Sequence, residues 1–211
     1  MPFVGHSKGG GMMMSLAEAR PDRCSAVVNL DGLPSRRPQP DVADHDRTKM
    51  LAKDLGAWLD HRRGANNAVR KPGTIAELAA RRARMNPRLT TGWLEHLVTV
   101  GARKDADGWR WKLDPTMRFG GFGPFRPEWA LYRMKGLAVP FLGIMGLEAE
   151  EMGWGTSPED LDGWLPYGAK LITLPDVGHF VHIEQPDIVA TAVLEFLEPQ
   201  RRRNATVGAS S

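Results

Sequence analysis

One short segment near the start of the sequence contains a residue suited to nucleophilic catalysis. Residues 5–9 read Gly-His-Ser-Lys-Gly, with an apolar stretch before them and a helical pattern after them. A serine at a tight turn between a strand and a helix has strained backbone angles, and the flanking glycines keep the neighbouring chain from colliding with it. The pattern therefore predicts that Ser7 is a nucleophile that attacks a carbonyl group.

A second segment, residues 174–186, contains two histidines. It reads Leu-Pro-Asp-Val-Gly-His-Phe-Val-His-Ile-Glu-Gln-Pro and lies between the last predicted strand and the last predicted helix. Because an imidazole takes and returns a proton near neutral pH, a histidine here could activate Ser7 and then a water molecule. The expected reaction passes through an acyl-enzyme that water hydrolyses.

Together, the two segments resemble the α/β-hydrolase family, in the branch that has a serine nucleophile and a helical cap. The resemblance covers most of residues 1–199 and implies a mostly parallel sheet with an inserted cap. It also implies that His179 is the catalytic base and His182 a loop or packing residue. Epoxide hydrolases and haloalkane dehalogenases of this fold have aspartate where this chain has Ser7, so the resemblance does not extend to them.

The triad acid has three candidates. The family usually has a Gly-x-x-Asp pattern after the strand that follows the cap, but here Gly146 leads to Ala149, flanked by Glu148 and Glu150. Other members of the family have the acid after the strand that follows the elbow helix, where this chain has Asp31. We place Asp31 first, Glu148 second and Glu150 third, since each could orient the imidazole and stabilise its protonated form.

The oxyanion hole is only half assigned. The backbone N–H of Lys8 is the expected first donor, while the family's second donor often follows an early strand in a His-Gly sequence, which this chain lacks. A missing donor costs about 3 kcal/mol of transition-state stabilisation. We therefore expect the chain to be the C-terminal two thirds of the fold, with an exposed edge at residues 2–4 through which copies self-associate.

The order of the predicted elements gives an α/β fold. Residues 1–34 and 136–199 form the hydrolase core, 35–135 the helical cap and 200–211 a disordered tail. A capping box at Thr74-Ile75-Ala76-Glu77 marks one helix start, and Ser157-Pro158 opens another helix. Predicted strands cover 2–4, 24–30, 139–145 and 171–174, and further helices cover 12–17, 47–59, 91–100, 128–134 and 188–197.

Aromatic residues of the cap have two interpretations. They either line an apolar acyl pocket or, more commonly for a helical cap, form its own core. Met12, Met13 and Met14 are expected to pack the elbow helix under the sheet, and the Asp107-Gly108 turn lacks the carboxylate spacing of a calcium loop. No metal or cofactor is predicted. The aromatic residues are Trp58, Trp93, Trp109, Trp111, Phe119, Phe122 and Phe125.

Composition excludes several classes of protein. With 211 residues, a single cysteine at Cys24 and no apolar run of about 20 residues, the chain is neither a disulfide scaffold nor a membrane-spanning protein. Its net charge is only +3 and its basic residues are scattered, which argues against nucleic-acid binding. Because a lone cysteine fits a reducing compartment and no signal peptide is visible, we expect a cytoplasmic location.

The leading hypothesis is a serine esterase acting on a small or medium apolar ester or related acyl substrate. One alternative is a truncated or degenerate hydrolase-fold protein without independent catalysis. A further alternative is a carbon–carbon bond hydrolase or a cofactor-free haloperoxidase of the same fold.

Overall fold

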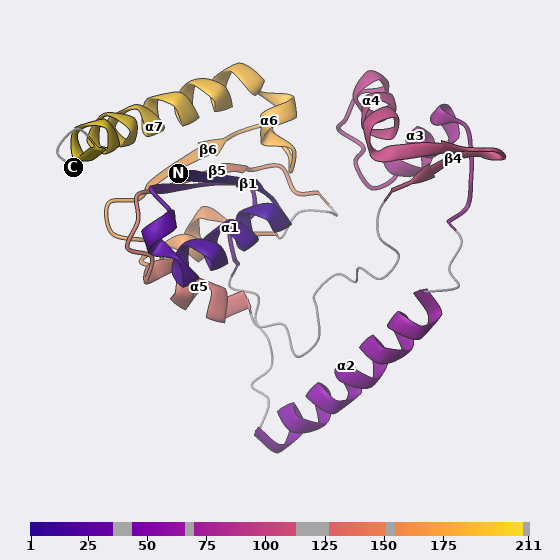
Figure 1. Cartoon of the computed structure of the whole chain (residues 1–211), viewed down its shortest axis with the longest axis horizontal. Coiled ribbons are helices and arrows are strands. Elements are labelled where there is room, and N and C mark those ends of the chain that lie inside the picture. The colour runs from indigo at the N-terminus through magenta and orange to yellow at the C-terminus, as the bar shows by residue number, and fades with distance from the viewer. Residues whose placement is uncertain (36–43, 66–69, 113–126, 151–154, 209–211) are drawn as a thin grey trace. The chain divides into compact units, whose positions relative to one another are not determined.

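A computed structural model describes residues 1–35, 44–65, 70–112, 127–150 and 155–208 (Figure 1). The chain divides into a core unit, Met1–Arg37 with Pro127–Ser211, and an insert unit, Pro38–Arg126. Helix α5 (Pro127–Lys135) belongs to the core unit, because Leu131 and Met134 are buried in its apolar cluster. The predicted cap, which ended at residue 135, therefore included this helix wrongly.

The core unit is built on a four-stranded sheet in which each neighbouring pair is parallel. Parallel strands need crossover connections, and the first is helix α1 (Lys8–Ala19). Both the α/β fold and the four predicted strands are confirmed. In spatial order the strands are β1 (Pro2–His6), β2 (Ala26–Leu30), β5 (Phe141–Gly146) and β6 (Lys170–Leu174).

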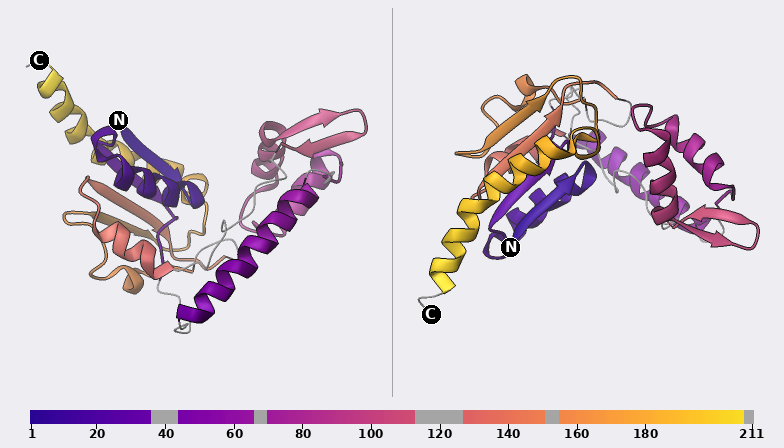
Figure 2. Two further views of the ribbon diagram at one scale, coloured as in Figure 1. Left: turned by 60° about the horizontal axis from the view of Figure 1, so that its bottom comes forward. Right: turned by 90° about the horizontal axis from the view of Figure 1, so that it is seen from above.

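Helices cover both faces of this sheet. Successive strand residues point to opposite faces, so Val27 packs in the cluster that contains Leu131 of α5, and Val28 packs in the cluster that contains Phe196. Phe196 belongs to helix α7 (Pro186–Gly208), which lies on the face opposite α1 and α5 (Figures 1 and 2). This layering buries the two central strands, β2 and β5, and leaves the strand ends available for a site.

One local prediction in the core unit is wrong, and another is right about where a helix begins but not about its length. Residues 200–208 continue α7, where a disordered tail was predicted, because arginine and alanine are good helix formers; 209–211 lie outside the described residues. The segment opened by Ser157-Pro158 is only a 3₁₀ turn, Pro158–Leu161. It stops there because Gly163 has a φ of 70° and a proline follows at 166.

The insert unit contains helices α2 (Asp44–Ala65), α3 (Ile75–Ala83) and α4 (Thr91–Gly101). The predicted capping box is present, with Thr74 Oγ1 accepting from Glu77 N–H at 3.1 Å and Glu77 Oε2 accepting from Thr74 N–H at 2.7 Å. A hairpin that the sequence analysis missed, β3 (Ala102–Asp105) with β4 (Gly108–Trp111), follows α4. The insert is therefore not purely helical.

The aromatic residues of the insert have varied surroundings. The Trp93 side chain is 42% exposed, whereas Trp58 packs against the guanidinium of Arg62. Phe119, Phe122 and Phe125 lie outside the described residues, so an acyl pocket lined by these rings stays a prediction. In the core unit, Met14 is buried under the sheet as expected, whereas Met12 is exposed.

Two further expectations concern the surface of the core unit. Strand β1 is an edge of the described sheet and its Val4 side chain is 47% exposed, while self-association through this edge stays a prediction. Within the described part of the chain, no helix combines the length and the apolar character that crossing a membrane requires.

Candidate active site

Ser7 lies at the sharp turn between β1 and α1. Its backbone has φ 54° and ψ −124°, and its N–H donates to the carbonyl oxygen of Leu30 at 2.9 Å, so the strand pairing holds the turn in place. A Cβ on Gly5 would lie 2.4 Å from the carbonyl oxygen of Gly9, so a side chain at position 5 would collide with the helix start. A Cβ on Gly9 would meet nothing within 4 Å. Of the two flanking glycines, only Gly5 is sterically required.

His179 lies in the loop that follows β6. Its side chain is 2% exposed, and its Nε2 atom is 2.9 Å from the hydroxyl oxygen of Ser7, although 172 residues separate the two in sequence. The loop begins at the sheet edge where β1 also ends, because the carboxyl ends of parallel strands lie together. The structure thus brings the predicted nucleophile and the predicted base into hydrogen-bond contact.

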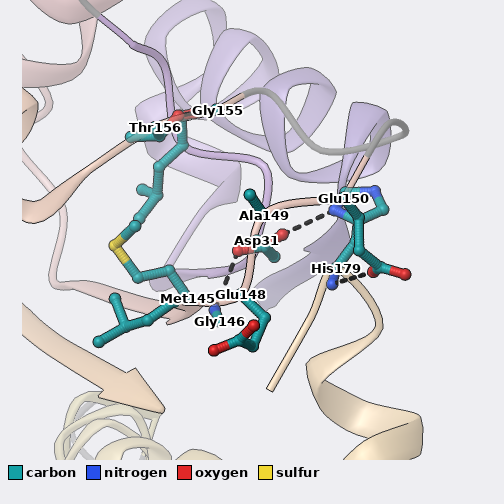
Figure 3. A pocket seen from close by; sticks show the side chains of 11 residues that line it. Asp31, Met145, Gly146, Glu148, Ala149, Glu150, Gly155, Thr156 and His179 are labelled. Atoms are coloured by element: carbon teal, nitrogen blue, oxygen red, sulfur yellow. Dashed lines mark hydrogen bonds and ion pairs between the residues drawn. The ribbon is translucent and has the colours of Figure 1, made fainter. Parts of the chain in front are cut away.

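Asp31 follows β2 at the same sheet edge and completes the chain of contacts. Its Oδ2 atom is 2.6 Å from His179 Nδ1, and its Oδ1 atom accepts from the backbone N–H of Gly146 at 3.1 Å (Figure 3). A carboxylate only accepts, so Nδ1 carries the proton and Nε2 offers its lone pair to the hydroxyl of Ser7. This tautomer is the one that general-base catalysis needs.

The other two candidate acids lie near His179 but contact it differently. Glu148 is exposed, and its backbone N–H donates to the carbonyl oxygen of Val177 at 3.0 Å. The Oε2 atom of Glu150 accepts from the backbone N–H of His179 at 2.5 Å (Figure 3). Of the three carboxylates, Asp31 is therefore the one in contact with the imidazole ring, and its role as the triad acid stays a prediction.

A cavity of about 170 Å³ opens beside Asp31 and His179. Both glutamates line it, together with Gly155 and Thr156 (Figure 3). All of its lining residues belong to the core unit.

Lys8 is the first residue of α1 and directly follows Ser7. N–H groups in the first turn of a helix have no acceptor within the helix, and the helix dipole makes this end positive. Such a position suits the predicted role of the Lys8 N–H as a donor to an oxyanion. That role stays a prediction.

The sequence indicated no role for His6, which the structure places against the loop that contains His179. Its Nε2 atom is 2.8 Å from the carbonyl oxygen of His179, and its ring contacts those of Phe180 and His182. Burial lowers the pKa of His6 to about 4 and also lowers the pKa of His182. Adjacency to Ser7 is the only signal in the sequence, since the partner of His6 is 173 residues away.

Among the described residues, no cluster of three or more His, Cys, Asp or Glu is arranged to hold a metal ion. The acidic side chains of the β3–β4 turn contact a cationic side chain instead. Asp105 and Asp107 both accept from the guanidinium of Arg110.

Comparison with known proteins gives one family and many similar structures. A family model described as the alpha/beta hydrolase family matches residues 3–192. No curated protein matches the chain.

Three solved structures illustrate the likeness of fold. A thioesterase domain from the curacin biosynthetic pathway is 22% identical, with a TM-score of 0.68, over 92% of this chain and 64% of that one. E-2-(acetamidomethylene)succinate hydrolase is 17% identical, with a TM-score of 0.62, over 93% and 66%. A Mycobacterium tuberculosis esterase is 19% identical, with a TM-score of 0.61, over 92% and 61%. The chain thus spans less than two thirds of each of these structures, and the likeness concerns the fold.

Proposed function

The chain belongs to the alpha/beta hydrolase family, and we propose that it acts as a serine hydrolase on a small or medium apolar carboxylic ester or related acyl compound. The observation that carries this proposal is the chain of two hydrogen bonds from Ser7 through His179 to Asp31, 2.9 Å and 2.6 Å long. Nucleophile, base and orienting acid come from three separate strand ends and lie in the hydrogen-bonded order that nucleophilic catalysis by serine requires.

The proposed reaction begins with proton transfer from Ser7 to His179. As the Ser7 hydroxyl oxygen attacks the substrate carbonyl carbon, Nε2 of His179 takes its proton, and Asp31 stabilises the resulting imidazolium. The carbonyl oxygen becomes an oxyanion, and the Lys8 N–H at the positive end of α1 donates to it.

Collapse of this intermediate breaks the bond to the leaving group. His179 gives its proton to the leaving alkoxide, and the acyl group stays on Ser7 as an ester. A water molecule then attacks the acyl carbon while His179 takes its proton. In the second collapse the bond from the acyl carbon to the Ser7 oxygen breaks, His179 returns the proton to that oxygen, and the acid is released.

The direct test is hydrolysis of p-nitrophenyl acetate, butyrate and octanoate by the purified chain, with butyryl thioester as a comparison. We expect activity in the parent and a loss of at least about 10³-fold in Ser7→Ala, because the nucleophile is removed. Ser15→Ala is the matched control, since Ser15 lies on the exposed side of the same helix.

Equal activity in the parent and in Ser7→Ala would contradict the proposal. No activity in a folded parent would favour the non-catalytic alternative. Cleavage of a carbon–carbon bond in a substrate, without hydrolysis of the esters, would favour the carbon–carbon bond hydrolase.

A further inference from the structure

We propose that His6 and Glu150 are positioning residues that hold the backbone of His179 from its two sides, so that its imidazole stays aligned with Ser7. This inference rests on the proposed function, because it assigns His179 the role of base. Neither side chain contacts the atoms that react. Each acts through a hydrogen bond to the main chain of His179.

His6 holds the carbonyl side. Its Nε2 atom is 2.8 Å from the His179 carbonyl oxygen, and a carbonyl only accepts, so Nε2 must carry a proton. When the His6 ring is neutral, its lone pair is therefore on Nδ1. Burial lowers its pKa to about 4, which keeps it in this form at neutral pH.

A neutral His6 also avoids charge repulsion with His179 when that residue is protonated. Its ring centroid is 4.7 Å from that of His179 and 4.6 Å from that of His182. The pKa of His182 is lowered by burial as well, so both neighbouring rings are uncharged at neutral pH. When His179 becomes an imidazolium, neither ring opposes the charge, and only one histidine of the three carries the proton.

Glu150 holds the N–H side. Its Oε2 atom lies 2.5 Å from the backbone nitrogen of His179, and it reaches there from the loop after β5 (Figure 3). The preceding N–H, that of Gly178, donates to Glu184 Oε1 at 3.1 Å. Two consecutive N–H groups of the loop therefore end on carboxylates from different elements.

These contacts restrict His179 at both of its peptide groups. Fixing the peptide planes before and after a residue fixes the direction of its Cα–Cβ bond, and Asp31 then fixes the rotation of the ring. Loss of either backbone contact allows the loop to shift. A displacement of about 1 Å between reacting groups can cost about 100-fold in rate.

Pairs of variants separate the effect of each hydrogen bond to the His179 main chain from the effect of side-chain size. His6→Gln keeps an N–H donor near the position of Nε2, whereas His6→Phe keeps an aromatic ring without a donor. Glu150→Gln keeps an acceptor oxygen, whereas Glu150→Ala removes it. Glu195→Ala is the matched control, because it also removes a carboxylate from the core unit and Glu195 is exposed on α7, outside the site.

The rate of labelling by a fluorophosphonate probe reports the alignment of Ser7 and His179. We expect His6→Phe and Glu150→Ala to label about tenfold more slowly or worse. His6→Gln, Glu150→Gln and Glu195→Ala should stay within about threefold of the parent. In ester hydrolysis the loss should appear in kcat with KM nearly unchanged, because neither side chain is assigned a contact with substrate.

A second readout does not depend on catalysis. The proton on His179 Nδ1 is hydrogen-bonded to Asp31 and should give a far-downfield signal in the proton NMR spectrum, assigned by its loss in Asp31→Asn. We expect this signal to broaden or shift in His6→Phe and Glu150→Ala while circular dichroism shows them folded. It should persist in the two glutamine variants.

The two readouts distinguish failure of the positioning role from failure of the proposed function. Parent-like labelling rates and an unchanged signal in both His6→Phe and Glu150→Ala would overturn the positioning role and leave the proposed function intact. If the parent is not labelled at all, the proposed function fails. The NMR signal then still decides whether the two side chains hold His179.

Discussion

The contacts within the core unit join residues that are far apart in the sequence, whereas those within the insert unit join residues that are close in the sequence. In the core unit, β2 pairs with β5 although more than a hundred residues separate them, and the candidate site lies where such strands end. In the insert unit, β3 pairs with β4 across a two-residue turn and the Thr74 capping box spans four residues. Long-range pairing places distant side chains together, whereas local pairing stabilises single elements. Substitutions at strand ends of the core unit should therefore affect chemistry, and those in the insert unit should affect local stability.

The largest expected effect concerns the acid. Asp31→Asn should lower kcat by about 10³- to 10⁴-fold, because an amide favours the wrong tautomer of the base. Asp105→Asn is the insert-unit counterpart, since Asp105 also accepts a side-chain hydrogen bond, from Arg110 at 3.1 Å. Kinetics with a p-nitrophenyl ester should show this second variant within about twofold of the parent. Similar losses of kcat in both variants would contradict the expected difference between the core unit and the insert unit.

The next largest effect is expected from adding a side chain at a glycine beside the Ser7 turn. A Cβ on Gly32 would lie 2.0 Å from the backbone carbonyl oxygen of Ser7, so Gly32→Ala must displace the elbow. We expect a loss of about 3 kcal/mol in the free energy of unfolding, at the upper end for overpacking, and loss of probe labelling.

Gly92 of α4 is the opposite case, because a Cβ there meets nothing within 4 Å. Gly92→Ala should raise stability by about 0.5 to 1 kcal/mol, since alanine is the better helix former. Urea unfolding measures both variants. A stable, labelled Gly32→Ala protein would show that the elbow is not held as tightly as described.

The pH dependence of stability should come from the core unit. The pKa of His6 is about 4 when folded and 6.5 when unfolded, so between these values the unfolded chain binds a proton that the folded chain does not. Stability should therefore fall as the pH decreases from 6.5 to 4 and become independent of His6 below that. Between pH 7 and pH 5 the expected loss is about 2 kcal/mol, and the lowered pKa of His182 adds to it in the same direction.

Urea unfolding at the two pH values checks this. His6→Gln should lose clearly less stability than the parent over the same interval, because its side chain does not titrate. An equal loss in the two proteins would assign the effect to other groups.

The smallest expected effect lies in the insert unit. Thr74→Ala removes the side chain that accepts from Glu77 N–H at 3.1 Å and should destabilise α3 by about 1 kcal/mol. Thermal unfolding followed at helical wavelengths would detect it. Probe labelling of Ser7 should proceed at the parent rate, and a slower rate would mean that the insert unit governs the site more strongly than proposed.

The features predicted correctly from the sequence are those encoded by short stretches of neighbouring residues. The elbow at Ser7 and the capping box at Thr74 are each encoded within a few residues, so their positions follow from short patterns. The β3–β4 hairpin was missed although Asp107-Gly108 is a turn signal. The first flank, Ala-Arg-Lys-Asp, does not alternate between apolar and polar residues as a half-buried strand does. The second flank alternates at Trp109-Arg110-Trp111, but a stretch this short does not by itself indicate a strand.

What the sequence left open depends on packing between distant segments. Asp31, Glu148 and Glu150 all follow strands that end at one sheet edge, so their order in the chain does not say which carboxylate reaches the imidazole. The backbone contact of Glu150 with His179 likewise depends on how two loops meet. Short patterns do not contain that information.

The central claim is that Ser7 is an activated nucleophile whose activation depends on His179 and Asp31. The most direct measurement is mass-spectrometric mapping of a fluorophosphonate adduct on the intact chain, alongside Ser7→Ala, His179→Gln and Asp31→Asn. We expect a single adduct on Ser7 in the parent, none in the first two variants, and labelling slowed by about 10³-fold or more in the third. An adduct on another residue, or an adduct on Ser7 that forms equally fast without His179, would contradict it.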